Sequence, residues 1–295
     1  MSSRPGVSSA PEVETAERLL RVDSATLASA LQISLPEARR EIQLLLTRAL
    51  GGDLAILLAH PERVPEARAT HAYSQAFARR LGGEPMAYVL GEREFYGLSF
   101  EVTPAVLIPR PETELLVEMA LQRLPEAAAA TVLDLGTGSG CIAVTLAKLR
   151  PAARVVASDV SQAALTVAER NARQQHVTNI EFRVGSWFEP VGGGQFELIV
   201  SNPPYVAAHD PHLREGDLRA EPRLALVAGP DGLEALRTIV LQAPKYLLRG
   251  GALIVEHGYD QAETVAQLFH AARFSDVIAR TDIAGIARAA AGRRP

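Results

Sequence analysis

The sequence predicts an α/β fold in which helices cover both faces of a mostly parallel sheet. Three observations support this: helical periodicity up to about residue 81, an aromatic and β-branched stretch around two glycines, and alternating strand-like and helix-like segments after residue 109. We expect a disordered tail over 1–12, a helical domain over 13–87, a β-hairpin linker over 88–108 and an α/β domain over 109–295.

The composition narrows the classes of function. A net charge of −4 argues against a protein that holds long nucleic acid by neutralising phosphates, so we expect no stable nucleic-acid binding. No apolar run approaches the ~20 residues that span a bilayer, and the first residues lack the apolar core of a signal peptide. A single cysteine, Cys141, fits a reducing compartment. We therefore expect a cytosolic protein without membrane contact.

The first part of the chain is predicted to form short helices. Apolar residues recur at helical spacing, and breaks are expected at Pro36, Gly51-Gly52 and Pro61. From Tyr88 to Ile108 the pattern changes to alternating aromatic, β-branched and polar residues around Gly91 and Gly97. That change predicts the hairpin between the two domains.

The α/β domain should contain strands and helices in alternation. Strands are expected over 130–136, 154–160, 179–185, 196–202 and 251–258, with helices over 141–150, 161–175 and 231–248. In parallel sheets of this kind ligands bind beyond the carboxyl ends of the strands. The segments "DLGTGSG", "SDV" and "SNPPY" all fall at that edge.

A glycine-rich loop joins the first of these strands to its helix. It contains Gly136, Thr137, Gly138, Ser139 and Gly140, and glycines there allow a tight turn and close approach to a ligand. A dinucleotide site is the rival interpretation, but the spacing is G-x-G-x-G, and the preceding Asp134 would repel a pyrophosphate. A cationic ligand suits the acid better, so we favour S-adenosylmethionine, with its ribose held by Asp159. A dehydrogenase or a non-catalytic binding module remains an alternative.

The segment "NPPY", residues 202–205, predicts the chemistry at the neighbouring strand end. Two prolines stop the strand and hold a rigid loop. The Asn202 side-chain oxygen and a backbone carbonyl such as that of Pro203 can accept both hydrogens of a planar NH₂ group, while Pro204 stiffens the loop and Tyr205 offers a packing face. Candidate acceptors are glutamine side chains and the exocyclic amines of adenine, guanine or cytosine. We expect no metal site.

These motifs, with "IPRPETE" (108–114), "EPRLALVAGPDGLEALR" (221–237) and "DIAGIAR" (282–288), resemble the release-factor glutamine methyltransferase family. The resemblance runs from about Gly83 to the C-terminus. It implies a Rossmann-like class I methyltransferase domain with a mostly parallel, seven-stranded sheet, and methylation of the glutamine in the Gly-Gly-Gln motif of peptide-chain release factors. Alternatives are a ribosomal-protein glutamine or an exocyclic amine of RNA or DNA.

The resemblance also implies roles for individual residues. Residues 136–140, Asp159 and Asn202 should bind S-adenosylmethionine, Trp187 should flank its adenine, and residues 202–205 should hold the substrate glutamine and act in catalysis. Arg110, Glu112 and Glu114 should lie near the mouth of the site, with no role assigned. The helical domain should dock the release factor, and we expect a monomer.

Overall fold

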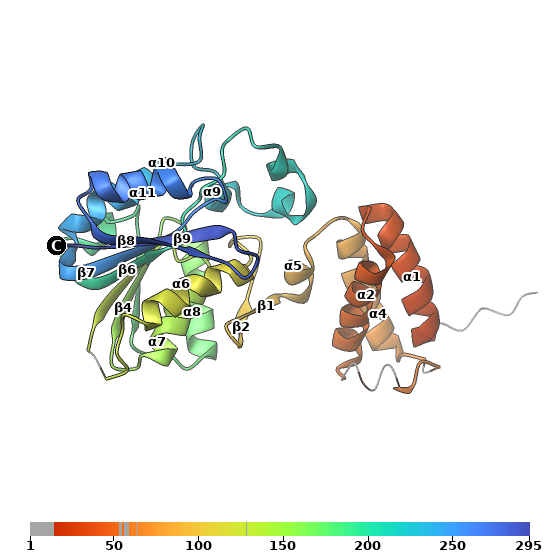
Figure 1. Cartoon of the computed structure of the whole chain (residues 1–295). Helices are drawn as coiled ribbons and strands as arrows, with labels where there is room; N and C mark the ends of the chain where they lie inside the picture. Colours follow the sequence, from red (N-terminus) through yellow and green to blue (C-terminus); the bar gives the residue numbers. More distant parts are fainter. Residues whose placement is uncertain (1–14, 53–54, 56–58, 63, 128) are drawn as a thin grey trace, which may run out of the picture. The chain divides into compact units, whose positions relative to one another are not determined.

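The computed structural model describes residues 15–52, 55, 59–62, 64–127 and 129–295. Two compact units divide the chain, Met1–Leu90 and Gly91–Pro295 (Figure 1). The tail expected over 1–12 lies outside the described residues. The division falls between Leu90 and Gly91, so the hairpin belongs to the second unit. The functional boundaries at 87 and 108 stay predictions.

The described part of the first unit is helical. Its elements are α1 (Ala16–Leu31), α2 (Leu35–Leu50), α4 (Ala67–Leu81) and α5 (Met86–Leu90). The side chains of Thr15 and Ser34 cap α1 and α2 by accepting from backbone amides in the first turn of each helix. Pro36 lies in that first turn of α2, where its missing amide hydrogen costs nothing. The break between the helices therefore comes before Pro36.

The second unit is built on a seven-stranded sheet in the order β5-β4-β3-β6-β7-β9-β8. Its strands are β3 (Thr131–Leu135), β4 (Arg154–Asp159), β5 (Ile180–Val184), β6 (Phe196–Ser201), β7 (Leu247–Glu256), β8 (Ser275–Thr281) and β9 (Ala287–Arg293). The first five strands in this order are parallel, while β9 and β8 pair antiparallel. The α/β fold and the mostly parallel sheet predicted from the sequence are confirmed.

Helices cover both faces of this sheet (Figure 1). The helices α6 (Glu114–Leu121), α7 (Cys141–Leu149) and α8 (Gln162–Gln174) contribute to the apolar core on one face, and α10 (Glu234–Gln242) and α11 (Ala262–Ala271) to the core on the other. Short turns lie at Pro111–Thr113 (η1), Glu189–Val191 (η2), Pro211–Arg214 (η3), Gly216–Ala220 (η4), Arg223–Leu226 (α9) and Ala243–Lys245 (η5). Among the residues that the structure describes, no helix combines the length and apolar character needed to span a bilayer.

The helix expected over 231–248 is shorter than predicted. The structure ends α10 at Gln242, and Leu247 already opens β7. Pro244 explains the difference, because proline disfavours the α conformation of the residue before it and cannot donate the next helical hydrogen bond. A 3₁₀ turn over Ala243–Lys245 takes the place of the last predicted helical turn.

Strand order places the candidate motifs side by side. The chain runs from β3 outward through β4 to β5 and then returns to place β6 on the other side of β3. Leu135 pairs in register with Ser158 on β4 and with Ser201 on β6. The residues that follow these three therefore emerge at one edge, at a topological switch point of the sheet.

The hairpin packs on the sheet domain through a buried asparagine. It consists of β1 (Glu92–Phe95) and β2 (Leu98–Glu101), joined by Tyr96 and Gly97, which both have positive φ. Asn171 on α8 accepts from the Glu101 amide at 2.7 Å and donates to the Glu101 carbonyl at 3.0 Å. The same Nδ2 donates to the Ser139 carbonyl at 2.8 Å, so one side chain joins the hairpin to the glycine loop.

A buried carboxyl group lies near the end of the central strand. Asp134 has no exposed surface, and Thr137 Oγ1 donates to its Oδ2 at 2.6 Å. Burial raises the pKa of Asp134 from 3.8 to about 7, against the opposing effect of the Thr137 hydrogen bond. The charge at this position therefore destabilises the folded state of the ligand-free protein near neutral pH.

Replacing Asn171 tests how the hairpin is held. Asn171→Ala leaves the buried Ser139 carbonyl and the part-buried amide and carbonyl of Glu101 without their partner, so we expect the free energy of unfolding to fall by about 2 to 3 kcal/mol. Denaturant titration measures it. Gln175→Ala, just after the same helix, removes a part-buried bond to the Ser99 carbonyl and an exposed bond from Lys148; it is the control and should cost about 1 kcal/mol or less. Equal losses in the two variants would contradict this role for Asn171.

Replacing Asp134 tests its raised pKa. The folded pKa lies above the unfolded one, so the stability conferred by the protonated group is present below 3.8 and is lost as pH rises to about 7. Relative to wild type, Asp134→Asn should therefore gain roughly 2 to 3 kcal/mol between about pH 5 and pH 8. Chemical unfolding of ligand-free protein at several pH values measures it, with the exposed Asp276→Asn as control. If the stability difference did not change with pH, the pKa of Asp134 would have to be the same in the folded and unfolded states.

Candidate active site

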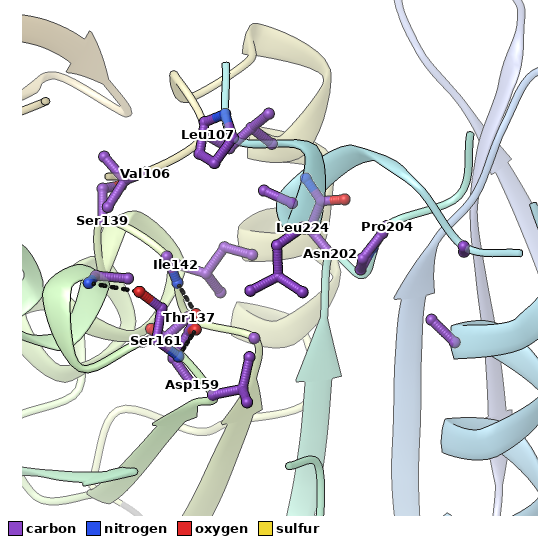
Figure 2. Close-up of a pocket in the computed structure, with 18 of the residues that line it drawn as sticks. Val106, Leu107, Thr137, Ser139, Ile142, Asp159, Ser161, Asn202, Pro204 and Leu224 are labelled. Atoms are coloured by element: carbon purple, nitrogen blue, oxygen red, sulfur yellow. Dashed lines mark hydrogen bonds between the residues drawn. The ribbon is translucent and has the colours of Figure 1, made fainter. Parts of the chain in front are cut away.

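A cavity of about 410 Å³ opens at the carboxyl edge of the sheet, a size typical of small-ligand sites (Figure 2). Its lining includes the predicted residues Gly136, Thr137, Gly138, Ser139, Asp159, Trp187, Asn202 and Pro204. Residues from the segment before α6 also line it: Ala105, Val106, Leu107, Pro109, Arg110 and Thr113. The cavity thus joins the glycine loop and the "NPPY" segment in one space.

Three predicted residues lie outside this lining: Gly140, Pro203 and Tyr205. Gly140 has a φ of 82°, and a Cβ there would lie 3.0 Å from the Cβ of Ala168. The absence of a side chain at this position therefore allows the loop to pack closely against α8. Pro203 is buried.

Four of the five amides of the glycine loop donate hydrogen bonds within the protein. Gly136 and Thr137 donate to the Ser158 carbonyl at 2.8 and 3.0 Å, and Gly140 donates to the Thr137 carbonyl at 2.8 Å. The Gly138 amide donates to Asp159 Oδ2 at 2.9 Å. A phosphate-binding loop instead points its amides at the ligand. The arrangement disfavours a pyrophosphate, because the amides are taken and a carboxylate stands among them.

Asp159 is held in a fixed orientation at the end of β4 (Figure 2). In addition to the Gly138 bond, its Oδ1 accepts from the Ser161 amide at 2.8 Å. Burial raises the pKa of Asp159, and the backbone hydrogen bonds oppose that shift. Both oxygens keep further lone pairs, so the carboxylate can accept from hydroxyl groups of a ligand in the cavity.

Trp187 lines the cavity from the segment that follows β5. It has a φ of 46°, unusual for a bulky residue. Its Cζ3 would lie 3.7 Å from a Cβ placed on Gly136, so the indole and the glycine loop stand close together. A planar ligand group could pack against this ring.

Asn202 belongs to a hydrogen-bonded network at the other end of the cavity. Its Nδ2 donates to Thr113 Oγ1 at 3.1 Å, and Thr113 Oγ1 donates to Glu256 Oε2 at 2.7 Å. The hydroxyl of Tyr205 donates to Glu256 Oε1 at 3.1 Å. In the described part of the chain, Asn202 Oδ1 accepts no hydrogen bond. The "NPPY" segment is thus linked to Glu256 at the end of β7 in two ways: through Thr113 from Asn202, and directly from Tyr205.

Burial dominates the electrostatics of this network. It raises the pKa of Glu256 to about 7, while the hydrogen bonds from Thr113 and Tyr205 favour the ionised form. The pKa of Tyr205 is raised, first by burial and then by the nearby Glu256 carboxylate. Tyr205 therefore remains a neutral hydroxyl donor at neutral pH.

Tyr205 faces a second pocket of about 580 Å³. Glu112, His212, Glu256 and Arg288 also line this pocket, and Arg110 lines both spaces. The ring of Tyr205, which was expected to pack against the substrate, therefore lines the second pocket and not the cavity that contains the glycine loop. Its hydroxyl is directed to Glu256.

The acidic and basic residues of "IPRPETE" have different surroundings. Arg110 forms an ion pair with the buried Glu221, which also accepts from the Ile108 amide at 3.0 Å. These bonds join the segment before α6 to the long connection after β6. Glu114 instead accepts from the Tyr96 amide at 2.9 Å and so holds the hairpin turn.

Sequence reasoning missed three residues of this region: Thr113, Glu221 and Glu256. A glutamate inside the apolar run "GALIVEHG" was a usable signal for Glu256, since a charged residue in a buried strand needs a partner. Thr113 carried no such signal, because a threonine between two glutamates in a loop is unremarkable by composition.

Two family profiles match the chain. One is described as the PrmC N-terminal domain and matches residues 23–91, and the other as the methyltransferase small domain and matches residues 112–216. Among solved structures, a methyltransferase from Pyrococcus furiosus has a TM-score of 0.53 at 18% identity, covering 75% of this chain and 98% of that one. At that identity the likeness shows the fold alone.

Relatives with high identity extend over nearly the whole chain. A release factor glutamine methyltransferase from Burkholderia pseudomallei is 50% identical over 277 residues, covering 92% of this chain and 97% of the relative. Its counterpart from Geobacter sulfurreducens is 45% identical over 284 residues, covering 96% and 98%. The chain therefore belongs to the release factor glutamine methyltransferase family.

Proposed function

We propose that this protein transfers a methyl group from S-adenosylmethionine to the side-chain amide nitrogen, N5, of the glutamine in the Gly-Gly-Gln motif of peptide-chain release factors. The observation that carries the chemistry is that Asn202 and the glycine loop line one cavity. A methyl donor bound at the loop and a substrate amide bound at Asn202 would then lie in the same cavity, with no protein segment between them. The names of the relatives support the choice of release factors as substrate.

The loop end of the cavity fits S-adenosylmethionine. Asp159 would accept from the ribose hydroxyls, and Trp187 would flank the adenine. The occupied loop amides and the Asp159 carboxylate favour a cationic ligand over a pyrophosphate. When bound, S-adenosylmethionine supplies an electrophilic methyl group on a sulfonium.

The Asn202 end of the cavity would hold the substrate amide. An amide nitrogen is a weak nucleophile because its lone pair is delocalised into the carbonyl group. Asn202 Oδ1 and a backbone carbonyl of the "NPPY" segment would accept the two N–H hydrogens, which orients the nitrogen and increases its electron density. The new N–CH₃ bond forms as the S–CH₃ bond breaks, and the nitrogen then loses one proton to solvent. Positioning supplies most of the effect, and no strong general base is required.

The docking of the release factor on the helical domain over 13–87, a monomeric state and a cytosolic location also stay proposals. The match of residues 23–91 to the PrmC N-terminal domain supports assigning that domain to the family. Its contact with the substrate is an expectation from the resemblance.

Transfer of a labelled methyl group tests the proposed function. Wild type should label a release factor that carries Gly-Gly-Gln and should leave its Gly-Gly-Ala variant, ribosomal proteins and RNA unlabelled. Asn202→Ala should reduce turnover by at least about a hundredfold while S-adenosylmethionine still binds, because a contact made in the transition state is lost. His209→Ala, exposed in the same connection, is the matched control. Label in nucleic acid alone would refute the proposal.

Calorimetric binding tests the cofactor end separately. Asp159→Ala should weaken the affinity for S-adenosylmethionine by roughly tenfold or more, since hydrogen bonds to a charged acceptor are lost. Asp260→Ala, an exposed acid, should bind as wild type does. An unchanged dissociation constant for Asp159→Ala would remove the ribose assignment.

A further inference from the structure

Glu256 is ionised above its pKa of about 7, and hydrogen bonding at Thr113 then has only one possible direction. A carboxylate can accept but not donate, so Thr113 must give its single hydroxyl hydrogen to Glu256 Oε2, 2.7 Å away. The Thr113 oxygen can then only accept. Asn202 must therefore turn its NH₂ group toward Thr113, as the 3.1 Å contact from Nδ2 shows.

The other end of the Asn202 amide faces away from this pair. Asn202 lines the cavity, and its Oδ1 accepts no hydrogen bond from the described part of the chain. Figure 2 shows the amide nitrogen and oxygen of Asn202 on opposite sides of the side chain. The oxygen is the atom left for a ligand.

Nothing in the covalent structure of asparagine imposes that choice. Rotation by half a turn about the last side-chain torsion exchanges oxygen and nitrogen with almost no change of shape, and this torsion is broad and roughly two-fold. The direction must come from a neighbour. Thr113 is that neighbour, and it is itself buried, with 2% of its surface exposed.

We propose that Thr113, held by Glu256, is a positioning residue that keeps the Asn202 oxygen toward the substrate and so makes the site select a glutamine amide over a glutamate carboxylate. This rests on the function proposed above. An acceptor oxygen attracts the NH₂ of glutamine and repels the carboxylate of glutamate. A reversed Asn202 would present NH₂ and do the opposite.

The proposal also gives "IPRPETE" a part in the chemistry. Its threonine lies at the end of η1, on a segment fixed by the bond from the Ile108 amide to Glu221 on one side and by the bond from Tyr96 to Glu114 on the other. Both partners are carboxylates that accept backbone amides. Thr113 is thereby placed by the backbone of its own segment, through two bonds that do not involve residues 202–205.

Thr113→Val and Thr113→Ser separate shape from hydrogen bonding. Valine keeps the volume and loses the hydroxyl, whereas serine keeps the hydroxyl. Transfer to the release factor should fall by about thirtyfold or more in kcat for Thr113→Val, and Thr113→Ser should recover most of it. The S-adenosylmethionine dissociation constant should stay within about twofold of wild type in both variants, because the loop end of the cavity is untouched.

The decisive measurement is the preference for glutamine over glutamate. Release factors carrying Gly-Gly-Gln or Gly-Gly-Glu are titrated into each variant, with S-adenosylhomocysteine in the cavity so that no transfer occurs. Wild type should bind the glutamine form at least about tenfold more tightly. Thr113→Val should reduce that ratio to within about threefold of unity, and Thr113→Ser should restore it. A merely structural role would lower both affinities and leave their ratio unchanged.

Two further comparisons keep the outcome clear. Because valine sets a methyl group against the Glu256 carboxylate, Thr113→Ala provides a second hydroxyl-free variant, and its ratio should fall as well. Glu118→Ala removes an exposed acid from α6, leaves the Thr113–Glu256 pair untouched and should keep the ratio. A wild-type ratio in folded Thr113→Val or Thr113→Ala overturns the positioning role. Failure of wild type to label any release factor overturns the proposed function, and with it this inference.

Discussion

The site depends on the parallel register of three neighbouring strands. Because β4, β3 and β6 are parallel and paired without offset at Ser158, Leu135 and Ser201, their carboxyl ends reach the same level. Parallel strands must be joined by long crossovers, so the segments that meet there are far apart in sequence. Everything that follows a strand end, including the glycine loop and the "NPPY" segment, is placed by this register.

Buried carboxyl and amide groups then hold the loops over that edge. Asn171 holds the hairpin to the glycine loop, Glu221 holds the segment before α6, and Glu256 holds Thr113. Burial of each of these polar side chains is tolerated because hydrogen bonds within the protein replace those it would make with water. The loops around the cavity are therefore fixed by directed bonds, where apolar packing alone would allow small rotations.

The two ends of the cavity suit different charges for a physical reason. At the glycine loop four amides bond to the protein and the Asp159 carboxylate remains, which favours a cationic ligand. At Asn202 the neutral oxygen of an amide remains, which favours a neutral donor group. At each end of the cavity, the tertiary contacts, more than the residue types, decide which polar atoms remain able to bind a ligand.

Local sequence patterns were sufficient for much of this description. The glycine loop, Asp159, the prolines at 203 and 204 and the alternation of strands and helices are short-range features, so the sequence by itself determined the α/β fold and the two motifs at its edge. Other features depend on distant parts of the chain: the helix end at Gln242, the pocket that Tyr205 lines, and the hydrogen-bonded network at Asn202. Thr113 and Glu256 are 143 positions apart, and Arg110 and Glu221 are 111 apart. Only the tertiary structure decided these pairs, because a hydrogen bond requires contact between atoms, and no local pattern specifies which distant residues will meet.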